Sequence, residues 1–221
     1  MHMKFVFPLF AAALFIVSCN SFSGKNAPDN KSVESAHQPD PVVYGDLDTA
    51  TFAAGCFWCE EAIFESLKGV KETVSGYSGG HTTNPTYEEV CSHTTGHTET
   101  VQVYYDPAMI SYQSLLEVYF GSQDPTQVDG QGPDHGDSYR SVIFYVNETE
   151  RNLAETYKKQ LNDSGKYSSP IAVIIEPLKV FYMAEAYHQN YEKNNPNNPY
   201  VRQVSIPRLN RMKELFPQLL K

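Results

Sequence analysis

The sequence predicts an α+β fold, a two-layer sandwich in which helices cover a small mixed sheet, with mixed α/β as the alternative class. Strand-like segments are interleaved with segments whose apolar residues recur every three or four positions. No phosphate-binding Gly-x-Gly-x-x-Gly or Gly-Lys-Ser/Thr loop accompanies them. Of the 221 residues, 41% are hydrophobic, which suffices for a folded core, and the chain shows no internal repeat. We therefore expect one folded domain over residues 49–221.

Residues 1–18 have the pattern of a secretory signal, because Lys4 precedes an apolar stretch, Phe5 to Val17, that is too short to span a bilayer. The stretch ends in the letters IVSC, which resemble the lipobox of bacterial lipoproteins and would make Cys19 the lipidated N-terminus. We expect an exported, membrane-anchored lipoprotein on the periplasmic or cell-surface side. The alternative is plain secretion, with Cys19 left in the precursor.

Residues 19–48 carry the lipidated cysteine and a segment rich in Ser, Asn, Asp, Pro and Gly, which predicts a flexible tether. The formal net charge of −9 argues against binding to nucleic acid or to anionic lipid headgroups, so the lipid is the expected membrane contact. Without Cys19 three cysteines remain, and an odd number in an exported protein is not a disulfide framework.

Strands are predicted where β-branched and aromatic residues lie between turn formers. These segments are 49–54, 70–77, 99–105, 140–146 and 171–175. The third ends at Asp106-Pro107, because proline cannot continue a ladder of hydrogen bonds. The last is apolar almost throughout, which predicts a central position in the sheet.

Helices are predicted where apolar residues recur at spacings of three and four. These segments are 57–68, a turn at 87–90, 111–120, a helix beginning after Asn147, and 183–193. Gly69 ends the first, and Asn147 with Glu150 has the spacing of a capping box. Between them, the polar, glycine-rich segment 121–139 predicts a long loop, which in a compact domain is usually functional.

Cys56 and Cys59 form a Cys-x-x-Cys pair where the first helix begins. A helix N-terminus favours a thiolate at Cys56, and the spacing brings Cys59 onto the same face one turn later. Three interpretations stay open: half of a zinc site completed by Cys91 and a histidine, a thioredoxin-like redox centre, or a nucleophile with its resolving partner. The intervening Phe57 and Trp58 are better suited to walling an apolar pocket than to a thioredoxin-like turn.

Glu99 shares one face of its predicted strand with Val101, Val103 and Tyr105. If this is the core face, burial raises the pKa of the carboxyl and provides a proton donor at neutral pH. The alternative is that Glu99, at the first position of the strand, reaches solvent or pairs with a base, and periodicity does not decide between them.

Several separated motifs strongly resemble the peptide-methionine (S)-S-oxide reductases, the MsrA family. In chain order they are GCFW at 55–58, GY at 76–77, NPTYEEVC at 84–91, TGHxE at 95–99, YDP at 105–107, DHGxxYRS at 134–141 and HQxY at 188–191. The resemblance covers residues 49–200 and implies an α+β sandwich with a ferredoxin-like core, no metal and no organic cofactor.

The resemblance also implies a role for each matching residue. Cys56 corresponds to the nucleophile that attacks the sulfoxide sulfur. Phe57 and Trp58 match the apolar wall that receives the substrate methyl group. Glu99 matches the acid that protonates the sulfoxide oxygen. The remaining matches are the hydroxyls of Tyr87 and Tyr139, which hydrogen-bond that oxygen, and Asp134, a polar residue of the same pocket.

The chain departs from the family pattern at Cys59, where most members have glycine, and it has no cysteine after Cys91. The resemblance therefore implies recycling through a Cys56–Cys59 disulfide, reduced by a thioredoxin-type protein. Expected substrates are oxidised proteins or free methionine S-sulfoxide, and a monomer is expected. The competing functions are a general Cys-x-x-Cys thiol–disulfide oxidoreductase and a zinc-holding surface lipoprotein.

Overall fold

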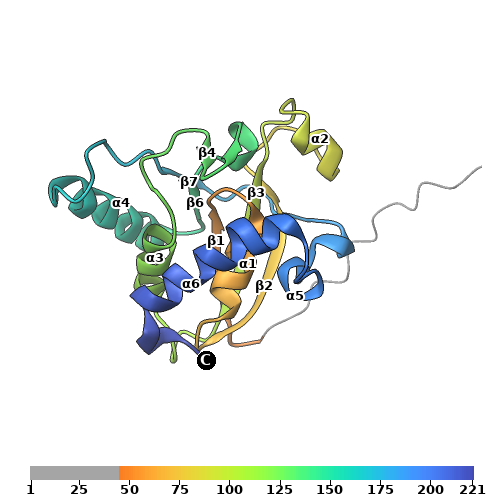
Figure 1. Ribbon diagram of the computed structural model, residues 1–221. Helices are drawn as coiled ribbons and strands as arrows, with labels where there is room; N and C mark the ends of the chain where they lie inside the picture. Colours follow the sequence, from red (N-terminus) through yellow and green to blue (C-terminus); the bar gives the residue numbers. More distant parts are fainter. Residues whose placement is uncertain (1–44) are drawn as a thin grey trace, which may run out of the picture. The chain divides into compact units, whose positions relative to one another are not determined.

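The computed structural model describes residues 45–221, and its centre is a mixed six-stranded sheet in the order β7-β6-β1-β3-β2-β8 (Figure 1). Its strands are β1 (Asp48–Ala53), β2 (Val70–Ser78), β3 (Thr98–Tyr105), β6 (Val142–Tyr145), β7 (Ile174–Pro177) and β8 (Tyr182–Met183). Neighbouring strands are antiparallel except β6 and β7. A separate two-stranded hairpin joins β4 (Gly130–Gln131) to β5 (Asp134–His135).

Six α-helices accompany the sheet in the described residues: α1 (Phe57–Glu65), α2 (Tyr87–Cys91), α3 (Tyr112–Gly121), α4 (Glu148–Asp163), α5 (Tyr191–Asn194) and α6 (Ile206–Leu215). Helix α1 follows β1 directly, and α6 runs beside it (Figure 1). A π-helical turn, Val201–Ser205, leads into α6. This arrangement confirms the predicted α+β class. In residues 45–221 every helix is too short or too polar to cross a membrane.

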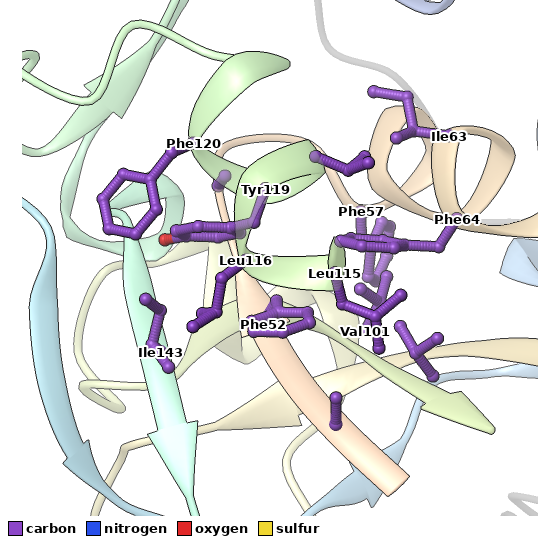
Figure 2. Close-up of a cluster of buried hydrophobic side chains, with 14 of the residues drawn as sticks. Phe52, Phe57, Ile63, Phe64, Val101, Leu115, Leu116, Tyr119, Phe120 and Ile143 are labelled. Carbon is purple, nitrogen blue, oxygen red and sulfur yellow. The ribbon is translucent and has the colours of Figure 1, made fainter. Parts of the chain in front are cut away.

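The core lies between one face of the sheet and helices α1 and α3 (Figure 2). Phe52 of β1 stacks on Phe64 of α1 and on Tyr119 of α3, with ring centroids 5.2 and 5.1 Å apart. All three side chains are fully buried, and each such burial contributes about 1.5–3 kcal/mol. The alternating pattern of β3 puts Val101 on the same face, so the strand parity used for Glu99 is confirmed.

Side-chain caps fix the starts of two helices. Asn147 accepts a hydrogen bond from the Glu150 amide at 2.9 Å, as its spacing predicted. The Glu150 carboxylate, however, reaches the amide of Val146, so the box is shifted by one residue. Helix α2 has a complete capping box, in which Thr86 and Glu89 accept from each other's amides. This box holds Tyr87 at the first position of the helix.

Three of the predicted elements are wrong in position or type. Segment 171–175 is not a central strand, because β7 begins only at Ile174 and lies at the edge of the sheet. The segment is apolar because Ile171 and Val173 are buried in the core before the strand starts. Segment 183–193 is not one helix, because Asn190 has a left-handed φ of 54° and separates a 3-10 turn from α5. The first helix ends at Glu65 instead of 68.

Two further differences concern loops and the chain's end. The predicted loop 121–139 contains the β4–β5 hairpin and a 3-10 turn, Asp137–Tyr139. Helix α6 was not predicted at all. The signal segment, Cys19 and nearly all of the tether lie outside the described residues.

Candidate active site

The turn between β1 and α1 places Cys56 at the N-cap of α1, where it is 6% exposed. Gly55 makes this turn with a φ of 75°, and its amide donates to the Tyr139 carbonyl at 3.2 Å. A Cβ at Gly55 would lie 2.5 Å from Cβ of Gln131 in the β4–β5 hairpin. Glycine is thus required both by backbone conformation and by the close approach of the hairpin.

Cys56 opens into a cavity of about 190 Å³. Its lining residues are Cys56, Phe57, Trp58, Tyr87, Glu99, Asp134, Tyr139, Asn198 and Tyr200. Seven of these were named from the sequence, and the fold brings them together from five separate segments. The volume is below the roughly 300–1,000 Å³ of typical small-molecule sites, and is on the scale of one amino-acid side chain.

Glu99 is the buried acid of this cavity, with 2% of its surface exposed. Its Oε2 accepts a hydrogen bond from the Phe57 amide at 3.0 Å. Burial, together with the nearby Asp134 and Cys59, raises the pKa of Glu99 to about 8, although the hydrogen bond from the Phe57 amide lowers it. The alternative in which Glu99 reaches solvent is therefore wrong, and the carboxyl is a protonated donor at neutral pH.

Two tyrosines at the cavity remain hydroxyl donors over the whole neutral range. Burial and the neighbouring Glu99 raise the pKa of both Tyr87 and Tyr139 above the usual value. The Tyr87 amide donates to Glu185 at 2.9 Å, which anchors α2 to the segment after β8. Tyr139 is the last residue of the 3-10 turn, and its carbonyl accepts the hydrogen bond from the Gly55 amide. Together with Glu99 they form a cluster of three O–H donors beside Cys56.

The aromatic wall is held by a segment near the end of the chain. Trp58 stacks on Tyr191 with centroids 3.7 Å apart and planes 8° from parallel. Its indole N–H donates to Nδ1 of His188 at 3.1 Å. Burial lowers the pKa of His188 to about 4, so the neutral ring accepts this bond. Phe57 also packs against His188, with centroids 4.9 Å apart. The sequence singled out the HQxY motif but assigned it no such role.

The two thiols are joined by a hydrogen bond. Burial, reinforced by Cys59, raises the pKa of Cys56 above its usual value, whereas a hydrogen bond from Cys56, together with Arg208, Ser205 and Tyr200, lowers the pKa of Cys59 to about 6. The predicted thiolate at Cys56 is therefore wrong for the resting pair, because burial outweighs the Trp58 amide at the helix N-terminus. The pair instead places its charge on Cys59, beside a Cys56 thiol.

A family model described as peptide methionine sulfoxide reductase matches residues 48–219, nearly the whole described part of the chain. The chain belongs to this family. It is similar to the peptide methionine sulfoxide reductases MsrA of Natronomonas pharaonis, at 50% identity over 77% of the chain and 96% of that protein, and of Thermus thermophilus, at 47% identity over 79% and 98%. The enzyme accordingly catalyses thiol-dependent reduction of methionine sulfoxide.

Two solved structures of reductases resemble this fold. Mxr1 of Saccharomyces cerevisiae in reduced form is 33% identical, with a TM-score of 0.64 over 69% of this chain and 88% of that one. Methionine sulfoxide reductase A of Corynebacterium diphtheriae is 36% identical, with a TM-score of 0.61 over 68% and 76%. The α+β fold of the reductase is therefore shared with enzymes of this activity.

Cys59 of the reductase lines a second cavity, of about 610 Å³, which also contains Arg208. Tyr200 and Asp134 line both cavities. The Tyr200 hydroxyl donates to Asp134 at 2.5 Å and lies 3.8 Å from the Cys59 sulfur. Sequence reasoning missed Tyr200, and found Asp134 without its partner. The hydrogen-bonded pair of Tyr200 and Asp134 therefore borders both the cavity at Cys56 and the cavity at Cys59.

The zinc alternative finds no support in residues 45–221, where no group of three or more His, Cys, Asp or Glu side chains is placed to hold a metal ion. Cys91 is half-buried, and its thiol lies beside the Tyr87 hydroxyl instead of lining the Cys56 cavity. The proposed ligand set of Cys56, Cys59 and Cys91 is thus not assembled in the reductase.

Proposed function

We propose that this enzyme reduces methionine S-sulfoxide through a Cys56 sulfenic acid and a Cys56–Cys59 disulfide. One observation carries the proposal: the Cys56 thiol and the buried, protonated Glu99 border one small cavity walled by Phe57 and Trp58. A sulfoxide needs a nucleophile on sulfur and a proton on oxygen at the same time, and this cavity offers both.

In the reductive step, the sulfoxide oxygen accepts hydrogen bonds from Glu99, Tyr87 and Tyr139, while the methyl group faces the aromatic wall. The sulfur of Cys56 attacks the sulfoxide sulfur as Glu99 protonates the oxygen, and Cys59 takes the thiol proton. The S–O bond breaks, methionine leaves, and Cys56 carries the oxygen as a sulfenic acid. Methionine sulfur gains two electrons and Cys56 loses two.

In the resolving step, Cys59 gives up the proton that it took from Cys56 and attacks the sulfenic sulfur as a thiolate; the S–O bond breaks, and the leaving hydroxide takes up that proton and departs as water. The hydrogen bond between the thiols and the low pKa of Cys59 support this role. A thioredoxin-type dithiol then reduces the disulfide by exchange, which regenerates both cysteines. Cys59 thereby replaces the resolving cysteine that most relatives of this pattern carry near the C-terminus.

The S epimer, the substrates and the location complete the proposal. The motifs resemble those of (S)-S-oxide reductases, which supports the S epimer over the R epimer. The signal pattern and the IVSC motif support export and lipidation at Cys19, so the substrates are oxidised proteins outside the inner membrane. Labelling with radioactive palmitate tests the anchor: wild type incorporates it and Cys19→Ala does not, whereas equal labelling would refute lipidation.

Two substitutions test the mechanism on a peptide with S- or R-sulfoxide. Cys56→Ser abolishes reduction with dithiothreitol, and retained turnover would refute Cys56 as the nucleophile. Cys59→Ser makes one equivalent of methionine and then stalls with thioredoxin as the reductant. Normal steady-state turnover of that variant would refute Cys59 as the resolving residue. Cys91→Ser is the matched control and turns over normally.

A further inference from the structure

Arg208 of α6 is buried behind the two cysteines, with 5% of its surface exposed. Its Nη1 donates to the Ala54 carbonyl at 2.9 Å and its Nε to the Ser122 carbonyl at 2.8 Å. Its Nη2 binds the Glu60 carboxylate in a buried ion pair. Ala54 and Glu60 flank the segment that carries both thiols, so contacts on each side of this segment hold the Arg208 guanidinium beside it.

Glu60 follows Cys59 in the chain and is 1% exposed. Its Oε1 binds Arg208, while its Oε2 has no hydrogen-bond partner among residues 45–221. Burial raises the pKa of Glu60 to about 7 in spite of Arg208, and the neighbouring Cys59 contributes to the rise. Burial with one unpaired oxygen disfavours the ionised form of Glu60, so this carboxyl neutralises the Arg208 charge only in part.

Cys59 and Arg208 line the same cavity, and Arg208 favours the Cys59 thiolate. The groups that face Cys59 come from every surrounding element. They are Cys56 and Glu60 of α1, Glu99 of β3, Tyr200 with its partner Asp134, Ser205 of the π-helical turn, and Arg208 of α6. Arg208 is the one buried cation among these described groups, since Arg211, which also lines the cavity, is exposed, and the Arg208 charge is shared between Cys59 and Glu60.

We propose that Arg208 is a positioning residue for disulfide formation: it stabilises the Cys59 thiolate that attacks the Cys56 sulfenic acid, and Glu60 competes for the same guanidinium. This inference rests on the proposed function. In the step concerned, the Cys59 thiolate forms the S–S bond, the sulfenic S–O bond breaks, and the leaving hydroxide takes one proton to become water. Arg208 touches neither substrate nor leaving group, and acts through the charge on Cys59.

The two halves of the ion pair predict opposite effects. Arg208→Met removes the positive charge, so the pH profile of disulfide formation moves to higher pH. Glu60→Gln removes the competing carboxylate, so the profile moves to lower pH. Arg208→Lys keeps the charge and restores part of the wild-type profile. If the ion pair is purely structural, Arg208→Met and Glu60→Gln should both slow disulfide formation, because each substitution breaks the same contact.

The experiment mixes reduced full-length enzyme with one equivalent of Met-S-sulfoxide peptide and quenches at intervals, over a pH series. Methionine formation reports the first step, and mapping of the Cys56–Cys59 disulfide reports the second. Below the pKa of Cys59, a shift of one pKa unit changes the thiolate population about tenfold, and we expect Arg208→Met to slow the second step by about this factor. Arg202→Met, at an exposed arginine of the π-helical turn that does not line the Cys59 cavity, is the matched control and shifts the profile much less.

Titration of the ultraviolet thiolate absorbance in a Cys56→Ser background measures the pKa of Cys59 independently of the reaction. The inference is refuted if Glu60→Gln and Arg208→Met shift the profile in the same direction, or if neither shifts it. If Arg208→Met does not fold, Glu60→Gln and Arg208→Lys decide by the same criterion. If wild type forms no Cys56–Cys59 disulfide, the proposed function fails instead, and the two failures are distinguishable.

Discussion

Replacing Glu99 by glutamine tests the acid at the centre of the cavity. The amide has the shape of the carboxyl, and its oxygen still accepts the hydrogen bond that the Phe57 amide donates at 3.0 Å. It also donates N–H bonds to a sulfoxide oxygen, but it transfers no proton. The substitution therefore removes the proton transfer and leaves the packing and most of the hydrogen bonding in place.

The expected loss follows from the protonation state. With a pKa of about 8, roughly nine-tenths of Glu99 is protonated at pH 7, about 300-fold more than for a carboxyl at the usual 4.5. General acid catalysis contributes about 10²–10⁴ in rate, equivalent to about 3–5 kcal/mol of transition-state stabilisation. We expect Glu99→Gln to slow methionine formation within that range, without change in substrate affinity beyond a few-fold.

The pH profile gives the sharper criterion. Because the pKa is raised, Glu99 is protonated below about pH 8 and loses its proton as the pH rises through that value. Single-turnover methionine formation by wild type should fall about tenfold per pH unit above about pH 8, and Glu99→Gln should lack this limb. A variant within twofold of wild type, or one that keeps the alkaline limb, would refute the assignment.

Glu61→Gln provides the matched control for this test. Glu61 is also buried, accepts hydrogen bonds from the Asn190 amide and the Ser75 hydroxyl, and has a pKa raised to about 7 by burial. It does not line the Cys56 cavity. Its replacement should leave the alkaline limb of the profile unchanged, so an effect at Glu99 alone identifies the cavity acid.

Three other predictions concern the cavity and its frame. Tyr87→Phe and Tyr139→Phe should each slow single-turnover reduction about tenfold, since each removes one hydrogen bond of about 1.4 kcal/mol to the sulfoxide oxygen; an unchanged rate in both would exclude them from the transition state. Gly55→Ala should lower stability by more than about 1 kcal/mol and reduce turnover, because its Cβ collides with Gln131; urea unfolding equal to wild type would contradict this. Asn147→Ala should cost about 1 kcal/mol in urea unfolding and leave turnover intact, and a loss of activity would show that the cap reaches the site.

Local sequence patterns predicted the strand face of Glu99 and the position of the turn at Cys56. The alternation of β3 placed Glu99 on the face of Val101, and the fold puts both side chains in the core. The glycine before Cys56 and the start of a helical period located the β1–α1 turn correctly. These predictions succeeded because strand parity and turn chemistry depend on residues only a few positions apart. Motif resemblance then supplied Tyr87 and the hairpin residues, which periodicity alone did not rank.

Long-range electrostatics was beyond the same reasoning. The dipole argument for a Cys56 thiolate used only the helix that begins there. The pKa values of the two thiols instead depend on burial, on the hydrogen bond between them and on Arg208, which lies 152 positions after Cys56 in the chain. Tyr200 was likewise one of fifteen tyrosines until the fold placed it at the border of both cavities.

The C-terminal segment links these observations. It supplies Tyr191 and His188 to hold the Trp58 ring, and Tyr200 and Arg208 to surround Cys59. A Cys-x-x-Cys pair at a helix start fixes the spacing of the two thiols but does not decide which sulfur is ionised. Here the thiol next to the acid cavity keeps its proton, and the thiol next to the buried arginine gives it up. The division of labour between nucleophile and resolving cysteine therefore depends on the end of the chain as much as on the motif.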